Sequence, residues 1–322
     1  MPKKLAKGRN PGMKKETVIV TGGAGFIGSQ LAERLLKEGY RVVVIDDLSS
    51  GQRSQVPAKA KFIQMNIRDV GLVNIFKKEK PAYVFHLAAQ IDLRFSIQNP
   101  IRDAETNIHG SLRVLEGCVR SGTKKIIFSS SGGAIYHGLS IRPTPENVPC
   151  MPMSPYGVAK LAFELYLHSA CHNYGLAYVA LRYANVYGPR QGAKGEAGVI
   201  GIFIQKMLRG VRPTIFGDGK QTRDFVYVDD VVEANILAMK GGIHGAFNIG
   251  TGKEISVNHV DALIRAELGV DTKCVHGPAN PGEERRAALD CTAAKKGLGW
   301  RPRVGIEEGI KRTVAWFHAR AS

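Results

Sequence analysis

A tyrosine and a lysine four residues apart are the clearest candidates for acid–base chemistry in this chain. Tyr156 and Lys160 lie in the segment SPYGVAK, and a spacing of four places both side chains on one face of a helix. Ser154 suits the N-cap and Pro155 the first helical position, so Tyr156 is expected near the positive end of the helix dipole. That dipole and the lysine ammonium favour the phenolate form, which predicts a tyrosine that acts as a base.

Three serines lie upstream of this pair, where a strand is expected to end. The apolar segment KIIF at 125–128 leads into Ser129, Ser130 and Ser131. In a doubly wound sheet, ligands bind beyond the carboxyl ends of the strands. The serine hydroxyls are therefore expected beside a substrate.

A glycine-rich turn, TGGAGFIG at 21–28, follows the apolar run TVIV and precedes a helical pattern. Glycines there allow a tight bend and a close backbone approach to a pyrophosphate, and the helix N-terminus favours phosphate. Asp46 and Asp47 end the next apolar run, where a carboxylate can bind a ribose. The pattern predicts an NAD site, with Arg53 as the nearby argument for NADP.

Strand-like and helix-like segments alternate through the first half of the chain. The expected strands are 17–20, 41–46, 61–65, 82–86, 125–129 and 178–183. The expected helices are 26–38, 70–78, 104–120 and 155–174. This alternation predicts right-handed βαβ units and an α/β fold with a doubly wound parallel (Rossmann) sheet.

The regular alternation loosens after residue 184, and glycine-rich loops separate shorter elements. We expect a disordered basic leader at 1–15, an NAD-binding Rossmann domain at 16–184 and a smaller C-terminal α/β substrate-binding domain at 185–322. Some segments of the second domain are expected to return to the first, with FVYV at 225–228 as the candidate.

The chain of 322 residues is strongly basic, with 45 Lys and Arg against 28 Asp and Glu, or a net charge of +17. Such a charge implies acidic partners, which could be nucleotides, phosphorylated metabolites, nucleic acid or a membrane surface, and composition does not choose among them. No apolar run is long enough for a transmembrane helix, and the basic N-terminus lacks the apolar stretch of a secretory signal. The five cysteines are odd in number and widely spaced, which argues against a disulfide framework or zinc site and favours a reducing cytoplasm.

Together these motifs resemble the extended short-chain dehydrogenase/reductases, specifically their NAD-dependent nucleotide-sugar epimerases and dehydratases. The resemblance covers roughly residues 16–318 and rests on the segments TGGAGFIGS, VIDDLSSG, HLAAQ, TNIHGSLRVLE, SSSGGAIY, SPYGVAK, LRYANVYGPRQ and FGDGKQTRDFVYVDD. It implies C4 epimerisation of a UDP-hexose (UDP-glucose, UDP-galactose or their N-acetyl forms) through a transient 4-keto sugar. It also implies a homodimer that uses NAD and a UDP-sugar and needs no metal, nucleic acid or membrane.

The resemblance also implies roles for individual residues. Tyr156 would be the base, and Lys160 would hold the nicotinamide ribose. Ser131 would bond to the reacting hydroxyl, with Ser130 as the alternative, because SSSGGAIY has one residue more between serine and tyrosine than is usual. The NAD site would comprise Gly22, Gly25, Phe26, Ile27, Gly28, Asp46, Asp47, Ser49, Ser50, Asn66, Ile67, Leu87, Ala88, Ala89, Asn107, Tyr156, Lys160 and Tyr183. The substrate site would comprise Ser131, Asn185, Gly198, Val199, Phe216, Arg223 and Glu283.

Some positions depart from the family's pattern. Asn66 stands where the family commonly has Asp beside the adenine, although an amide can still accept a hydrogen bond. Asn280 stands where a second phosphate-binding arginine is expected, so either Arg285 or Arg286 compensates or the substrate is held differently. Ala287 is small at the position that often limits sugar size, which implies room for an N-acetylhexosamine.

Three alternative functions stay open at this point. A UDP-glucuronate 4-epimerase would need a cation for the sugar carboxylate, such as Arg94. A nucleotide-sugar 4,6-dehydratase would need acidic groups after the serines, but the segment GGA at 132–134 carries none. A non-enzymatic dinucleotide-sensing Rossmann protein would have no need of the complete serine–tyrosine–lysine set.

Overall fold

The computed structural model describes residues 15–136, 138, 141–192, 198–279 and 284–321. The expected leader, apart from Lys15, lies outside the described residues, and so do Asn280 and Glu283.

Seven parallel strands form the central sheet, in the spatial order β11, β6, β5, β4, β1, β2, β3. Their bounds are Thr17–Thr21 (β1), Arg41–Asp46 (β2), Lys61–Gln64 (β3), Tyr83–His86 (β4), Lys125–Ser131 (β5), Ala177–Tyr183 (β6) and Gly245–Ile249 (β11). The predicted doubly wound fold is confirmed. Because the winding reverses between β1 and β4, a crevice is expected at their carboxyl ends.

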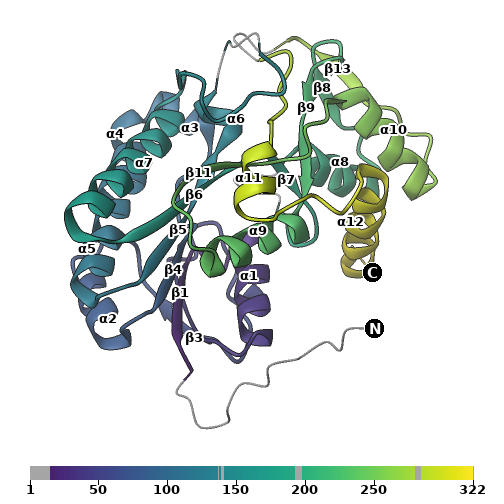
Figure 1. The fold of residues 1–322 in the computed structure, drawn as a ribbon. Coiled ribbons are helices and arrows are strands. Elements are labelled where there is room, and N and C mark those ends of the chain that lie inside the picture. Colours follow the sequence, from purple (N-terminus) through teal and green to yellow (C-terminus); the bar gives the residue numbers. More distant parts are fainter. Residues whose placement is uncertain (1–14, 137, 139–140, 193–197, 280–283, 322) are drawn as a thin grey trace, which may run out of the picture.

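Helices cover both faces of this sheet (Figure 1). On one face lie α1 (Phe26–Lys37) and α9 (Val228–Lys240), and on the other lie α2 (Leu72–Glu79), α5 (Ser111–Ser121) and α7 (Pro155–Tyr174). The alternation of side chains along β1 supplies both cores: Val18 and Val20 pack in one apolar cluster and Ile19 in the other. Burial on both faces explains why the strands are continuously apolar.

The single helix expected at 104–120 is divided into three parts. The helix α4 (Pro100–Ala104) is followed by a π-helical segment (Glu105–Gly110) and then by α5. The wider π turn contains Asn107, whose side chain accepts from the backbone N–H of Gln90 and donates to its carbonyl, each at 2.8 Å. Single-turn π segments often occur at functional sites, and this one lies beside the carboxyl end of β4.

A smaller unit packs beside the carboxyl edge of the sheet (Figure 1). It contains three two-stranded pairs, β7 (Asn185–Tyr187) with β10 (Phe225–Tyr227), β8 (Thr214–Phe216) with β13 (Val275–Gly277), and β9 (Thr222–Arg223) with β12 (Ile255–Ser256). Its helices α8 (Val199–Leu208), α10 (Val257–Leu268) and α12 (Ile306–Ala321) enclose a separate apolar core.

The segment 225–228, the candidate for a return to the first domain, does not join the large sheet, although Val226 packs in the apolar cluster on one face of that sheet. This segment forms β10 and the start of α9, and β10 pairs with β7 in register Phe225–Asn185. The strand that joins the large sheet is β11, which pairs with β6 and continues into the bond from Ala184 N–H to the Ile249 carbonyl at 2.9 Å. Both segments are short and apolar, so their composition did not distinguish them.

None of the helices within the described segments combines the length and apolarity needed to cross a bilayer.

Candidate active site

The turn between β1 and α1 forms a close-fitting cradle at the crevice. Gly22 has a φ of +71°, and a Cβ there would lie 2.6 Å from the backbone nitrogen of Ala88. A Cβ on Gly28 would overlap the carbonyl oxygen of Gly22. No side chain caps the N-terminus of α1 at Gly25, so this end can bind an anion. The cradle therefore fits the pyrophosphate of a dinucleotide, with Phe26 and Ile27 in the first turn.

Asp46 lies beside this cradle at the end of β2. Its carboxylate accepts from the backbone N–H groups of Ala24 (2.9 Å) and Leu48 (2.8 Å). Burial raises the pKa of Asp46, and these two backbone donors oppose that rise. The carboxylate is thus fixed at the place where a ribose would bind.

The polar residues around Asp47 bond to one another beside Asp46. Asp47 accepts from the hydroxyl of Ser49 (2.6 Å) and from the side-chain amide of Asn66 (2.6 Å). Asn66 thus donates a hydrogen bond to the Asp47 carboxylate. The Asp that is common in the family at this position would place a second negative charge there instead. Arg53, the residue that favoured NADP, lies over the Phe62 ring at 4.6 Å.

The segment after β4 closes the other side of the crevice. Leu87, Ala88 and Ala89 follow His86 directly, and Ala88 N–H donates to the hydroxyl of Thr21 at 3.3 Å. Ile67 packs in the apolar core beside Gly110. The fit is close, because a Cβ on Gly110 would lie 2.8 Å from the Ile67 side chain.

A buried histidine supports the segment that follows β4. The sequence analysis did not single it out. His86 is fully buried, and its ring nitrogens bond to the hydroxyls of Thr21 (2.8 Å) and Ser111 (2.9 Å). Burial lowers the pKa of His86 to about 3, and the nearby charge of Lys160 adds to this effect. The ring is therefore neutral at neutral pH. Ser111 in turn donates to the carbonyl of Asn107 at 2.7 Å. His86 is thereby connected through Ser111 to the π segment.

The helix that carries the tyrosine and lysine forms as the sequence predicted. The Ser154 hydroxyl caps α7 by accepting from Gly157 N–H at 3.1 Å, and Pro155 is the first helical residue. Tyr156 and Lys160 are both buried, and Lys160 Nζ lies 5.5 Å from the centroid of the Tyr156 ring. Lys160 also donates to the Ser129 carbonyl at 2.8 Å. The lysine is thus held between the tyrosine and the end of β5.

The three serines of β5 have different surroundings. The Ser130 hydroxyl donates to the buried carboxylate of Glu164 at 2.5 Å, so it faces the protein core. Ser131 is only half-buried and ends the strand, directly before the short helix α6 (Gly132–Ile135). Alternate residues of a strand face opposite sides. This geometry favours Ser131 over Ser130 as the substrate-facing hydroxyl.

Tyr183, which the sequence analysis assigned to the NAD site, is buried at the end of β6. Its hydroxyl accepts from the side chain of Asn235 at 2.8 Å. Burial raises its pKa, while the hydrogen bonds to Asn235 and Ser129 act in the opposite direction. Tyr183 thus lies beside the serine strand.

A pocket lies between the serine turn and the smaller unit. Its walls include Gly132 and Gly133 from the serine turn, the predicted Asn185, the segment 287–289, Asp224 and Glu284. Asp224, also missed from the sequence, accepts from the backbone of Thr251, Gly252 and Leu289.

The remaining predicted substrate residues lie around the smaller unit. Gly198 and Val199 form the N-terminus of α8, and Phe216 ends β8 with its ring partly exposed and the Arg94 guanidinium 5.8 Å above it. Arg223 donates to the Glu284 carbonyl at 2.8 Å.

The two arginines proposed to compensate for Asn280 are both ion-paired. Arg285 makes two bonds to Asp218, at 2.9 and 3.0 Å. Arg286 makes two to Glu254, both at 2.8 Å. Both guanidinium groups are thus already engaged by carboxylates of the smaller unit.

A buried ion pair connects the elements of the site. Arg182 on β6 makes hydrogen bonds of 2.6–3.2 Å to both oxygens of Glu164 and one of 2.6 Å to the Tyr136 hydroxyl. Burial alone lowers the pKa of Arg182, but the bonds and charge of Glu164 outweigh it and raise the pKa above its usual value. Glu164 follows Lys160 by four residues, a spacing that could have revealed their shared helix face.

Within the described residues, no three His, Cys, Asp or Glu side chains gather as candidate metal ligands. The groups that the fold brings together are a tyrosine, a lysine and a serine at the sheet edge that also carries the glycine cradle.

Comparison with known proteins places this site in context. A sequence model of the NAD dependent epimerase/dehydratase family matches residues 18–250. The UDP-glucose 4-epimerase of Mycolicibacterium smegmatis is 42% identical over 311 residues, which cover 94% of this chain and 99% of that protein.

Two solved structures share the fold along nearly their whole length. The UDP-glucose 4-epimerase of Thermotoga maritima, solved with UDP-glucose, is 49% identical with a TM-score of 0.93 and covers 95% of this chain and 100% of that chain. The UDP-glucose 4-epimerase of Thermus thermophilus, solved with NAD, is 41% identical with a TM-score of 0.89 and covers 94% of this chain and 99% of that chain.

We expect Glu164→Gln to lower the free energy of unfolding by about 3–5 kcal/mol, because Arg182 would lose its charged partner in the core. Urea denaturation measures this difference. The matched control is Glu105→Gln, which removes an exposed ion pair to Arg68 (3.4 Å) and should cost less than about 1 kcal/mol. Equal, small losses for the two variants would contradict the structural importance of the buried pair.

Proposed function

This chain belongs to the NAD dependent epimerase/dehydratase family, and from that premise we propose that it is an NAD-dependent epimerase that inverts C4 of a UDP-hexose, interconverting UDP-glucose and UDP-galactose. One observation carries the proposal. The Tyr156–Lys160 pair adjoins the end of the serine strand, and that strand ends at the same sheet edge as the glycine cradle between β1 and α1.

Each of the three residues has a separate task. Tyr156 takes the proton from the sugar 4-hydroxyl while Ser131 holds that oxygen by a hydrogen bond. Lys160, fixed by the Ser129 carbonyl, keeps a positive charge near the phenol and favours its ionised form. After the 4-keto sugar has turned over in the pocket, Tyr156 returns the proton to the oxygen.

The chemistry that NAD supplies when bound is reversible hydride transfer at C4, so the overall reaction consumes no oxidant. The chain's contribution is positioning and a tuned proton donor and acceptor. Gly22, Gly28 and Asp46 provide the cradle and the ribose contact. Asn185 and Arg223 bind the diphosphate, and Phe216 packs against the uracil.

The pocket walls support the N-acetyl sugars as further substrates. Its lining includes the small residues Gly132, Gly133 and Ala287 beside the larger Tyr136 and Leu289. A small residue at position 287 favours a sugar that carries an acetamido group. The same glycines offer no acid for the elimination of water, which disfavours a 4,6-dehydratase.

A UDP-glucuronate 4-epimerase is also less well supported. Arg94, the cation considered for the sugar carboxylate, lies against Phe216, the residue assigned to the uracil. It is not among the residues that line the pocket beside Gly132.

We place the enzyme in the cytoplasm. All five cysteines are free thiols, which suits a reducing compartment.

A homodimer is supported by an exposed apolar surface on neighbouring helices. On α3 (Leu93–Gln98) and α4 the exposed large apolar side chains are Leu93, Ile97 and Ile101, and on α7 they are Val158, Leu165 and Tyr166. Both α3 and α4 contact α7. Several exposed apolar side chains on neighbouring helices favour a protein interface, and a second copy of the chain covers them.

The activity is tested first. Denatured protein should release NAD, and the native enzyme should invert C4 of UDP-glucose and UDP-galactose. Tyr156→Phe should lower kcat by about 10²–10⁴-fold, because the proton acceptor is lost, while NAD remains bound. Tyr174→Phe, at the exposed end of the same helix, is the control and should leave kcat unchanged. Absence of released dinucleotide, or full activity of Tyr156→Phe, would refute the proposal.

The dimer is tested by light scattering, which should give twice the chain mass of 35.0 kDa. Leu165→Glu should halve the measured mass, because a charge would be buried in the interface. Val70→Glu changes an equally exposed residue outside this surface and should preserve the dimer. A monomeric wild-type protein would refute this arrangement.

A further inference from the structure

The pocket wall opposite the serine turn is an irregular segment. Residues 284 and 287–289 line the pocket, yet the segment 284–289 forms neither helix nor strand. It also lies close to the chemistry, since a Cβ on Gly132, the residue after Ser131, would come within 2.5 Å of the Leu289 side chain. A segment without its own hydrogen-bond ladder must be fixed from outside.

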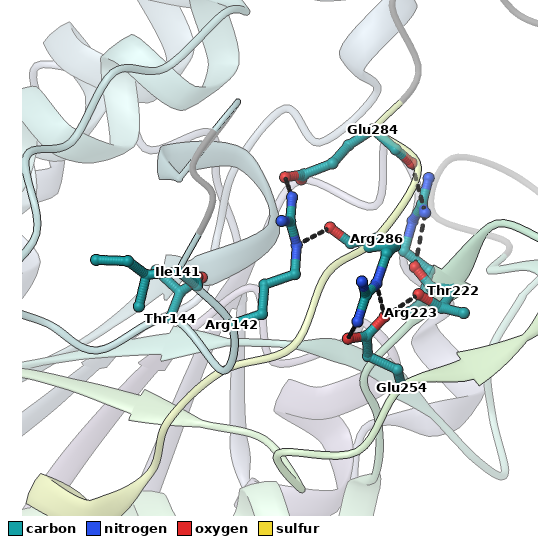
Figure 2. A network of polar contacts seen from close by, with 8 residues as sticks. All are labelled: Ile141, Arg142, Thr144, Thr222, Arg223, Glu254, Glu284 and Arg286. Atoms are coloured by element: carbon teal, nitrogen blue, oxygen red, sulfur yellow. Dashed lines mark hydrogen bonds and ion pairs between the residues drawn. The ribbon is translucent and has the colours of Figure 1, made fainter.

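Arg142 fixes the wall from the side of the large sheet (Figure 2). Its Nε donates to the Arg286 carbonyl at 2.7 Å, and its Nη2 lies 3.2 Å from the Glu284 carboxylate. The guanidinium therefore bonds to the wall at Glu284 and at Arg286, which directly precedes Ala287. Two backbone bonds continue the contact, from Thr144 N–H to the Ala288 carbonyl (2.8 Å) and from Asp290 N–H to the Thr144 carbonyl (2.9 Å).

The smaller unit holds the same wall from its other side (Figure 2). Arg286 pairs with Glu254, which also accepts from the Thr222 hydroxyl at 2.6 Å. Hydrogen bonding from Arg286 lowers the pKa of Glu254 to about 2, so this anchor is charged at neutral pH. Arg223 donates to the Glu284 carbonyl. The wall thus spans two units. Arg142 holds it to the first by side-chain hydrogen bonds, and Leu289 packs there against Ile135 and Tyr136.

We propose that Arg142 and Glu284 form a positioning pair that fixes the pocket wall containing Ala287 and thereby sets the selectivity between UDP-hexoses and UDP-N-acetylhexosamines. This inference rests on the proposed function. The pair acts on the substrate only through the wall, so the proton transfer at Tyr156 does not depend on it.

The partial exposure of Arg142 and Glu284 indicates that breaking their contact changes the wall without unfolding the protein. Arg142 and Glu284 are 20% and 18% exposed, so breaking their contact does not leave a fully buried charge. The backbone bonds of Thr144 remain in such a variant. The wall would loosen while the fold persists.

Steady-state kinetics of the holoenzyme on UDP-glucose and UDP-N-acetylglucosamine test this inference. Arg142→Met should raise the KM for UDP-glucose about fivefold, equivalent to ~1 kcal/mol, with kcat within about twofold. The ratio of kcat/KM for UDP-N-acetylglucosamine to that for UDP-glucose should rise several-fold, because a loosened wall gives the larger N-acetyl sugar more space than the fixed wall does. Arg142→Lys should restore these values only partly, since an ammonium cannot bond both groups in the same geometry.

The control is Arg265→Met on α10, which removes an ion pair to Asp261 (3.0 Å) of similar exposure, 21% and 10%. It should lower the melting temperature as much as Arg142→Met does, without changing KM or the substrate ratio.

An unchanged KM and ratio in Arg142→Met, or equal changes in the control, would overturn the positioning role while leaving the proposed function intact. A wild-type enzyme that inverts neither substrate would overturn both.

Discussion

The geometry of the site depends on one buried contact, the ion pair between Glu164 of α7 and Arg182 of β6. Glu164 lies on the same helix as Tyr156 and Lys160, and it also accepts from Ser130 of β5. The pair therefore fixes the helix that carries the base against the strand that carries Ser131. Because an uncompensated charge in the core is costly, the helix cannot slide along the strand without breaking this contact.

Local sequence signals were sufficient for much of this arrangement. The Ser154–Pro155 start of α7, the glycine turn and the apolar strands each act over a few residues, and the structure has them where the sequence predicted. The contacts that tune the site join distant segments instead. Arg182 reaches Tyr136, and Tyr136 donates to Asn248 at 3.0 Å. Periodicity carries no information about such partners, so they could not be predicted.

Two details of the fold also depend on contacts between distant segments and could not be predicted from the sequence. The segment 225–228 and the strand β11 look alike in sequence, and only the pairing partner decides which sheet each joins. The π turn contains Asn107, whose amide bonds to Gln90, a tertiary contact that the regular helical pattern of the sequence does not reveal. The net charge is equally uninformative at this scale, since Arg142, Arg285 and Arg286 beside the pocket all pair with carboxylates.

In the proposed reaction, C4 of the sugar loses and regains the same hydrogen within one site. The most direct measurement uses UDP-glucose that carries deuterium at C4, incubated with the holoenzyme in ordinary water, followed by mass spectrometry of the UDP-galactose formed. The product is expected to keep its deuterium at C4. Replacement of that deuterium by solvent hydrogen would rule out this reaction.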